Sequence, residues 1–374
     1  MKKGWKTKTL GEACEMYQPK TISGKDMVED GPYPVYGANG VIGRYNQFNH
    51  EEPQLLITCR GATCGSVNIS APRSWVTGNA MVVRPKNESL EMRYLEYLFR
   101  GGIDISKAIT GAAQPQITRT NLEPLEISFP ESLAEQQRIV GLLDEAFEGL
   151  ATAKANAEKN LQNARALFES HLQSVFTQRG PGWVEKALGD VFTTATGTTP
   201  PKNNAEFYGD FMPLVKPPEL CDEAFDTAPD GLSEAGAGVA RTLPAKSILV
   251  SCIGNLGKIG LNTVPVAFNQ QINAILPDES QAIPEFMFFQ SLSPVFKSQL
   301  ESLASGTTVP IVNKSKFNSV RVVLPPLPIQ KPVVAQLTAL HEETQRLARL
   351  YERKHAALEA LKKSLLHQAF SGEL

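Results

Sequence analysis

The chain has no hydrophobic run that could cross a membrane, since a helical span needs about 20 consecutive apolar residues and none of that length occurs. Its first residues, MKKGWKTKTLGE, carry lysines with no apolar segment behind them, so they do not form a secretory signal. We therefore expect a cytoplasmic protein with no membrane partner.

Metal-binding patterns are also missing. The 5 cysteines include no C-x-x-C pair, and the 5 histidines include no H-E-x-x-H. Cys59 and Cys252 end the apolar stretches LLITC and SILVSC, so we expect both to be small buried hydrophobic residues. No metal site is predicted.

Catalytic signatures for nucleotide chemistry are absent as well. An adenine methyltransferase needs a [DN]-P-P-[YFW] motif to hold the flipped base, and the nearest string here is KPPE, at residues 216–219. GANGVIG, at residues 37–43, lacks G-x-G-x-x-G spacing, and no G-x-x-x-x-G-K-[ST] loop for ATP is present. We predict no catalytic residue in this chain.

The chain also has no large excess of positive or negative charge. The formal net charge is −2, from 37 basic and 39 acidic residues. A phosphate-binding protein with this balance needs its basic loops clustered on one face.

What the sequence does contain is an internal repeat. GWKTKTLGE, which begins at Gly4, returns as GWVEKALGD from Gly182. Five further segments return in the same order, which predicts a duplicated unit. They pair LLITCRGATCGSV with ILVSCIGNLGKIG, AMVVRP with INAILP, YLEYLF with PEFMFF, GAAQPQITRTNLEPLEISFP with GTTVPIVNKSKFNSVRVVLP, and LAEQQRIVGLL with LPIQKPVVAQL.

Each unit divides into two parts. The first has short Val, Ile and Leu runs between Gly, Pro, Asn and Ser, which predicts strands and turns with one or two helices. The second lacks Gly and Pro over long stretches and is rich in Ala, Leu, Glu, Lys and Gln, which predicts one long helix. The predicted fold class is α+β, with two homologous mixed α/β domains separated by two long helices.

The long helices carry apolar residues at alternating spacings of four and three, in seams that superpose 194 residues apart. A period near 3.5 favours an antiparallel coiled coil; the alternative is that each helix packs on its own domain. Centring the seams places Asn160 beside Thr344, a polar pair that could fix the register. The residues predicted to pair the helices are Ile139, Leu143, Leu150, Asn160, Leu167, Val333, Leu337, Leu340, Thr344, Leu347, Tyr351, Leu358, Leu361 and Leu365.

From Gly4 to Leu374 the chain resembles the specificity subunit of type I restriction–modification systems. The resemblance rests on four motifs: the repeated opening GW-x(4)-LG-[DE], the Gly-rich turn after an apolar strand, G-x-x-[QV]-P, and L-x-x-Q…[IV]-V-x-x-L at the start of each helix. The chain departs from the pattern where Lys331 and Pro332 replace a Gln-Arg pair, and proline in a first helical turn is tolerated.

The resemblance implies two target-recognition domains, residues 1–132 and 179–326, each reading half of a bipartite site in double-stranded DNA. It implies spacer helices at 133–178 and 327–374 that set the gap between the half-sites. It also implies two methyltransferase subunits as partners and, through them, restriction subunits. S-adenosylmethionine, ATP and Mg are then expected in those partners, and no cofactor in this chain.

Two other functions stay open. The chain could be the recognition part of a self-sufficient DNA methyltransferase or nuclease, or a coiled-coil adaptor that never touches DNA.

Candidate DNA contacts are polar or basic residues on Gly- and Pro-rich loops, since side chains that reach base edges give specificity. Gln and Asn can bind adenine, Arg can bind guanine, and Lys suits phosphates. In the first unit the candidates are Lys20, Thr21, Lys25, Tyr36, Asn39, Arg44, Tyr45, Arg60, Thr63, Gln114, Gln116 and Arg119. In the second unit they are Thr198, Thr199, Lys202, Asn203, Lys216, Asn255, Lys258, Thr307, Thr308, Asn313, Lys314 and Lys316.

Overall fold

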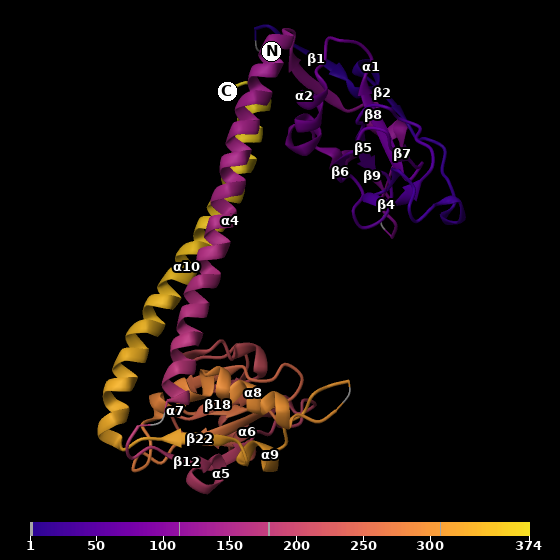
Figure 1. Ribbon diagram of the computed structural model, residues 1–374. Coiled ribbons are helices and arrows are strands. Elements are labelled where there is room, and N and C mark those ends of the chain that lie inside the picture. The colour runs from indigo at the N-terminus through magenta and orange to yellow at the C-terminus, as the bar shows by residue number, and fades with distance from the viewer. Residues whose placement is uncertain (1–2, 112, 179, 307) are drawn as a thin grey trace. The chain divides into compact units, whose positions relative to one another are not determined.

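The computed structural model describes residues 3–111, 113–178, 180–306 and 308–374. The chain forms two compact units, Met1–Glu158 with Arg353–Leu374, and Lys159–Glu352. Two long helices, α4 (Leu133–Thr177) and α10 (Leu327–Ser371), each contribute one part to each unit (Figure 1). We call the globular part before α4 the first head and the globular part before α10 the second head.

The first head contains three sheets of importance here. The strand orders are β2-β8-β5-β6, β4-β3-β7 and β1-β11. The strands are β1 Trp5–Thr9, β2 Cys14–Tyr17, β3 Tyr33–Gly37, β4 Gly40–Tyr45, β5 Leu55–Thr58, β6 Val67–Ile69, β7 Trp75–Val76, β8 Ala80–Pro85, β9 Ile109–Thr110, β10 Gln116–Ile117 and β11 Glu126–Pro130. The α-helices are α1 Leu10–Ala13, α2 Met92–Tyr97 and α3 Arg119–Leu122.

The second head repeats this arrangement with one strand added to each large sheet. Its orders are β13-β21-β18-β19-β15, β16-β14-β20-β17 and β12-β22. The strands are β12 Val184–Ala187, β13 Thr193–Thr196, β14 Tyr208–Val215, β15 Glu223–Phe225, β16 Gly231–Leu232, β17 Thr242–Leu243, β18 Ile248–Ser251, β19 Ile259–Asn262, β20 Val266–Phe268, β21 Ile272–Leu276 and β22 Arg321–Leu324. The α-helices are α5 Leu188–Val191, α6 Glu234–Val239, α7 Pro284–Leu292, α8 Pro294–Leu303 and α9 Lys314–Asn318.

Matching strand orders confirm the predicted duplication and the α+β fold class. In both heads the strand that opens the repeat pairs antiparallel with the strand that precedes the long helix, β1 with β11 and β12 with β22. In both heads one strand pair of the smaller sheet is parallel, β3 with β7 and β14 with β20.

The repeated Leu-Gly of the opening motif has a packing role. Leu10 and Leu188 are fully buried, and their N–H groups donate to Leu125 O at 2.7 Å and Val320 O at 2.8 Å. The glycine that follows lies so close to the helix before the last strand that a Cβ on Gly189 would stand 2.7 Å from the Asn318 side chain. The motif therefore fixes the short helix after the first strand against the end of the head.

A buried glutamine joins each long helix to its head. The Gln136 side chain donates to Ser89 O at 3.0 Å and Pro130 O at 2.8 Å, and accepts from Glu91 N at 2.8 Å. Gln330 does the same in the second unit, donating to Gln281 O at 2.9 Å and Pro325 O at 2.8 Å and accepting from Ile283 N at 2.8 Å. Both glutamines are fully buried. This is the structural reason for the glutamine of the L-x-x-Q motif.

Each head completes its hydrophobic core with one end of both helices. In the first unit Ile139 and Leu143 of α4 and Leu366 and Ala369 of α10 are buried in the same core as Leu10. The second core buries Phe168, Leu172 and Phe176 of α4 with Leu337 of α10. The helix ends thus pack on their heads, as the alternative to a simple coiled coil required, while still packing beside each other.

The helices run antiparallel in both units. In the first, Lys154 pairs with Glu359 at 2.8 Å and Glu158 with His355 at 3.6 Å. Residue numbers therefore rise along α4 while those of the partners fall along α10. In the second, Arg165 lies 3.6 Å from Glu352, and the ring of Phe168 lies 4.9 Å from that of His341.

The predicted register is wrong. Thr344 is buried and shares a cavity of about 370 Å³ with Phe168 and Leu172, whereas Asn160 is exposed. Asn160 lies two to three helical turns from the part of α4 that faces Thr344. The register follows from Phe168, Leu172 and Leu337, which are buried in the core of the second head, and not from a polar pair at the centre.

The predicted seam is correct near the start of each helix and fails at one position toward the C-terminal end of each. Ile139, Leu143, Leu337 and Thr344 are buried, but Leu167 and Leu361 are 62% and 47% exposed. The remaining apolar candidates are partly buried: Leu150, Val333, Leu340, Leu347, Tyr351, Leu358 and Leu365.

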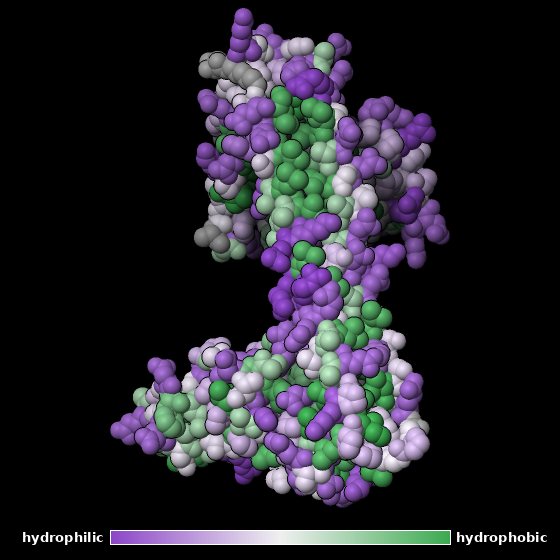
Figure 2. All heavy atoms as spheres, turned by 90° about the vertical axis from the view of Figure 1, so that its left-hand side faces the viewer, coloured by the Kyte–Doolittle hydropathy of each residue, from purple (hydrophilic) through white to green (hydrophobic). Residues whose placement is uncertain are grey.

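The shift has a geometric cause. A straight helix with 3.6 residues per turn drifts from a strict 3.5 repeat, so the buried position moves by one residue, from Leu167 to Phe168. Leu361 fails at the equivalent place in the other copy. Hydrophobic side chains are consequently exposed along both helices (Figure 2).

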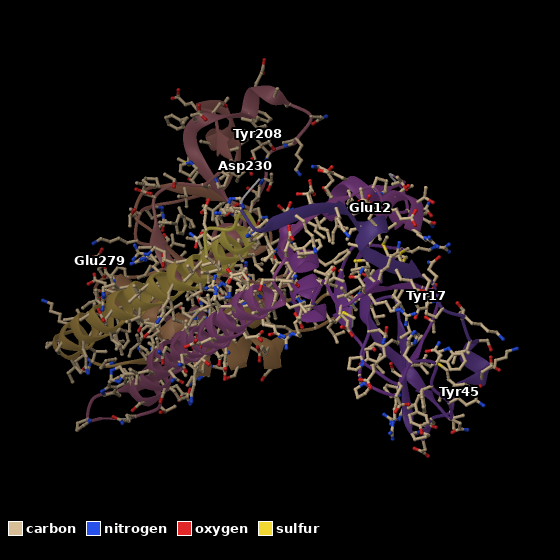
Figure 3. All side chains as sticks on the ribbon, turned by 90° about the horizontal axis from the view of Figure 1, so that it is seen from above. Glu12, Tyr17, Tyr45, Tyr208, Asp230 and Glu279 are labelled. Atoms are coloured by element: carbon tan, nitrogen blue, oxygen red, sulfur yellow. The ribbon has the colours of Figure 1, made fainter. Side chains whose placement is uncertain are left out.

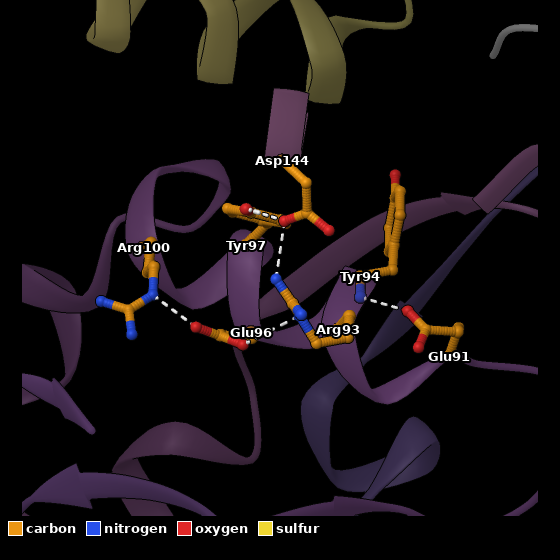
Figure 4. A network of polar contacts seen from close by, with 7 residues as sticks. All are labelled: Glu91, Arg93, Tyr94, Glu96, Tyr97, Arg100 and Asp144. Carbon is orange, nitrogen blue, oxygen red and sulfur yellow. Dashed lines mark hydrogen bonds and ion pairs between the residues drawn. The ribbon is translucent and has the colours of Figure 1, made fainter. Parts of the chain in front are cut away.

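A polar network also connects α4 to α2 in the first unit (Figure 4). Asp144 accepts hydrogen bonds from the Tyr97 hydroxyl and from Arg93, the latter at 2.6 Å. Glu96 joins Arg93 to Arg100. Arg93 and Asp144 are 53% and 41% exposed, so this pair stabilises the fold only slightly.

Over the parts of the chain that the structure describes, no helix has the length and apolar character to span a membrane.

Replacing either glutamine should destabilise the unit that contains it. Gln136→Ala and Gln330→Ala each leave one buried N–H and two buried carbonyls without their partner, which costs about 3 kcal/mol. Urea unfolding monitored by circular dichroism measures the loss. Gln137→Ala is the matched control, because Gln137 is the exposed neighbour; equal stability of the Gln136 and Gln137 variants would contradict this account.

Candidate nucleic-acid interface

The candidate loops of the first head meet at one edge of the β2-β8-β5-β6 sheet. Gly78 N donates to Thr21 Oγ1 at 3.2 Å, and Cys59 N donates to Asn79 O at 3.3 Å. The Thr58 hydroxyl donates to Ala38 O in the β3–β4 turn. Side-chain and main-chain hydrogen bonds thus connect the loops that contain Thr21, Ala38, Cys59 and Gly78 in one surface.

Equivalent loops of the second head meet in the same way. Thr199 Oγ1 donates to Gln270 Oε1 at 3.0 Å, and Cys252 N donates to Gln271 O at 2.8 Å. Asn269 N donates to Val215 O at 3.0 Å, which brings in the loop that begins at Lys216.

The Gly-rich turn and the G-x-x-x-P turn pair with each other in both heads. In the first, Gly61 N donates to Pro115 O at 3.1 Å, and Arg60 faces Gln116 across an antiparallel bridge. In the second, Gly254 N donates to Pro310 O at 2.9 Å, and Ile253 faces Ile311. We call Arg60, Gln114 and Gln116 with their two turns the first tip, and Ile253, Val309 and Ile311 with theirs the second tip.

A glycine is required at the start of each G-x-x-x-P turn. Gly111 and Gly306 have φ of 84° and 104°, which other residues rarely adopt. A Cβ on Gly111 would stand 2.6 Å from Gln114 O, and one on Gly306 would stand 2.3 Å from Val309 O. Both turns therefore begin with a glycine of positive φ that lies close to the carbonyl oxygen three residues later.

The cysteines at the base of the tips are structural. Cys59 and Cys252 are buried, as predicted. Burial raises the pKa of the Cys59 thiol and raises that of Cys252 to about 12, so both thiols are protonated and unreactive. Among the described residues no group of three or more His, Cys, Asp or Glu side chains could hold a metal ion.

Several predicted contact residues of the first head have internal partners. The Tyr36 hydroxyl accepts from Ala71 N at 3.0 Å, Arg44 donates to Gly31 O and Pro32 O, and Arg119 pairs with Glu123 at 2.6 Å. Thr21 binds Gly78, and Tyr45 packs edge-on against Trp75. Glu12, Tyr17 and Tyr45 follow one another along this head in Figure 3. The exposed candidates are Lys20, Lys25, Asn39, Arg60, Thr63, Gln114 and Gln116.

The second head divides similarly. Lys216 pairs with Asp230, Thr198 accepts from Arg241 N at 2.8 Å, and Asn313 caps α9 by accepting from Lys316 N at 3.0 Å. The exposed candidates are Lys202, Asn203, Asn255, Thr308 and Lys314. Lys258 and Lys316 are half-buried, and Thr307 lies outside the described residues. That any of these side chains touches nucleic acid stays a prediction.

Sequence reasoning missed residues at both edges. Asn79 and Gln270 are exposed amides directly before β8 and near the start of β21, and Val309 and Ile311 lie on the second tip. The sequence did contain a signal for these four residues, because each precedes or belongs to a segment that aligns between the two copies of the repeat. A position-by-position comparison of the two copies would have found them.

Comparison with known proteins identifies the family of this chain. The family model described as "Type I restriction modification DNA specificity domain" matches residues 2–161 and again 181–352. The chain belongs to this family. The two matches contain the two heads, so the resemblance predicted from the repeated motifs is confirmed.

Named relatives are specificity subunits. The chain is 30% identical over 298 residues to the "Type I restriction enzyme HindI specificity subunit" of Haemophilus influenzae, covering 77% of this chain and 62% of that one. It is 24% identical over 314 residues to the "Putative type I restriction enzyme MjaX specificity subunit" of Methanocaldococcus jannaschii, covering 79% and 71%. The match thus spans less than two thirds of the Haemophilus subunit.

Solved structures share the fold. A chain from a study of complex assembly and conformational transition of the type I R-M system aligns over 100% of this chain and 99% of its own, with a TM-score of 0.79 and 18% identity. The HsdS subunit from Thermoanaerobacter tengcongensis aligns over 100% and 98%, with a TM-score of 0.56 and 18% identity.

Alanine at either turn glycine should open one tip only. Gly111→Ala forces a Cβ into Gln114 O and a strained φ, at a cost of ~1–2 kcal/mol, so amide hydrogen exchange at Gly61 and Ile117 should accelerate. Gly306→Ala should do the same at Gly254 and Val312. Gly149→Ala, in an open position of α4, is the control and should leave both tips protected. Unchanged exchange at the tips would show that the glycines are not needed.

Proposed function

We propose that this chain is the DNA-specificity subunit of a type I restriction–modification complex, in which each head reads one half of a bipartite target. The observation that carries the proposal is the pair of tips: the same two turns, joined by the same main-chain bonds, carry different exposed side chains. Two half-sites of different sequence require two binding loops with the same backbone support and different side chains.

Exposed lysines beside the tips support contact with the phosphate backbone. Lys20 and Lys25 in the first head, and Lys202 and Lys314 in the second, are exposed, although the chain is slightly acidic overall. Lysines supply the salt-dependent part of DNA affinity, which carries no sequence information. The chain should therefore bind weakly alone and more tightly within a complex.

Exposed leucines along α4 and α10 support docking of methyltransferase subunits, with restriction subunits attached through them. Leu133, Leu142 and Leu361 are 39%, 42% and 47% exposed, and no side chain of the described residues covers them fully. The paired helices would also set the gap between half-sites. In this scheme the partners bind S-adenosylmethionine, ATP and Mg and carry out the chemistry, in keeping with a sequence that lacks the motifs for those ligands.

Binding and methylation assays test the function. The chain co-purified with its methyltransferase subunits should methylate DNA at one bipartite motif, read by sequencing the modified DNA. The chain alone with a labelled methyl donor should transfer nothing. Transfer by the chain alone would establish a self-sufficient methyltransferase, and an assembly with no sequence preference would contradict the proposal.

Surface leucines should matter for assembly and not for folding. Leu361→Gln should leave the free energy of unfolding within about 0.5 kcal/mol of the parent, as expected for an exposed site, but weaken capture of methyltransferase subunits in size-exclusion chromatography. Leu366→Ala, at a buried position of the same helix, should instead destabilise the chain by about 3 kcal/mol. Undiminished assembly of Leu361→Gln would remove this surface from the docking site.

A further inference from the structure

The main-chain bonds described for the two tips are equivalent. Ile117 N donates to Cys59 O at 2.9 Å, and Val312 N donates to Cys252 O at 2.8 Å. Thr110 faces Gln116 in a strand pair, and Ser305 faces Ile311 in a bridge. These bonds align the tips residue by residue, with Arg60 at the position of Ile253, Gln114 at that of Val309 and Gln116 at that of Ile311.

All three aligned positions change chemical class. The first tip presents a guanidinium and two amides, which donate and accept hydrogen bonds. The second tip presents three branched aliphatic side chains, which do neither. Val309 and Ile311 are 46% and 38% exposed, and Ile253 is partly exposed.

The second tip is not part of the core of its head. The next residue, Val312, is 1% exposed and fills the core, whereas Val309 and Ile311 remain on the surface. In Figure 1 the described residues that follow α8, on both sides of position 307, project away from the rest of this head. Exposed branched aliphatic residues at neighbouring positions of one loop are a candidate contact surface for another molecule.

The surroundings of the second tip favour DNA over protein as that molecule. Asn255, Thr308, Asn313 and Lys314 are exposed around it, and no acidic residue lies within either turn. Such a rim suits phosphates. Within the major groove, the base feature that an aliphatic side chain can distinguish is the C5-methyl group of thymine.

We propose that the second tip reads thymine through its C5-methyl group, by contact with Val309 and Ile311 and support from Ile253, whereas the first tip reads purine edges through Arg60, Gln114 and Gln116. The inference rests on the proposed DNA-specificity function and adds the base class that each half-site contains.

Deoxyuridine tests the proposal, because it lacks only the methyl group of thymine. The protein in complex with its methyltransferase subunits is titrated with duplexes that carry the bipartite motif, with thymines of one half-site replaced by deoxyuridine. Replacement in the half read by the second head should raise Kd about three- to fivefold per contacted methyl, the value of one buried methyl group. Replacement in the other half should leave Kd unchanged, but 7-deazapurines there should raise it.

Variants assign the half-sites and provide controls. Gln116→Ala should alter preference in the first head's half-site only. The double variant Val309→Ala with Ile311→Ala should bind more weakly and lose its sensitivity to deoxyuridine in the other half. Gln114→Ala with Gln116→Ala, the matched double variant of the first tip, should keep that sensitivity.

Three outcomes would overturn the inference while leaving the DNA-specificity function intact. They are a second half-site without thymine, specific binding that is indifferent to deoxyuridine, and a Val309/Ile311 double variant that loses partner subunits while its deoxyuridine response persists. Failure of the parent complex to prefer any sequence would instead contradict the proposed function itself.

Discussion

A single buried glutamine at the start of each long helix is the constraint on which the architecture depends. Gln136 and Gln330 each make three hydrogen bonds. The side-chain amide donates to a carbonyl at the end of the last strand and to one in the loop before α2 or α7, and its oxygen accepts from the N–H of the residue just before that helix. Because every buried polar group must find a partner, the helix cannot rotate or slide relative to its head without breaking all three. The direction of each helix is therefore set inside its own head.

Duplication allows the two copies to differ wherever the frame does not need a particular side chain. Phe147 packs edge-on against Tyr97 at 5.5 Å, and His341, at the equivalent place, packs against Phe289 at 5.9 Å. Lys362 lies over the Phe147 ring at 5.2 Å, where the other copy uses Phe168 against His341 at 4.9 Å. Burial lowers the pKa of His341, which favours the neutral form of its ring among these aromatic neighbours. The two copies thus make contacts at equivalent positions with side chains of different chemistry.

Features shared by the two copies of the repeat could be predicted from the sequence, whereas contacts between residues distant in the chain could not. The duplication, the helix starts at Leu133 and Leu327 and the burial of Cys59 and Cys252 followed from motifs shared by both copies. The exposure of Leu167 and the position of Thr344 did not follow from these motifs. A seven-residue pattern shows neither where a straight helix departs from a 3.5-residue repeat nor which hydrophobic core buries the end of the helix. Lys216 looked free on a loop, and only the fold brings Asp230 to it. The aliphatic second tip was overlooked because polarity, rather than alignment, guided the choice of contact residues.

Each tip is held by main-chain bonds and by a glycine with positive φ, and none of these supports involves the side chains at the three variable positions. If the tips read DNA as proposed, point mutations there would change the base that is read while leaving these backbone supports in place. Under that proposal, natural selection could change the target one nucleotide at a time in either half-site, with the same backbone supporting each new set of side chains.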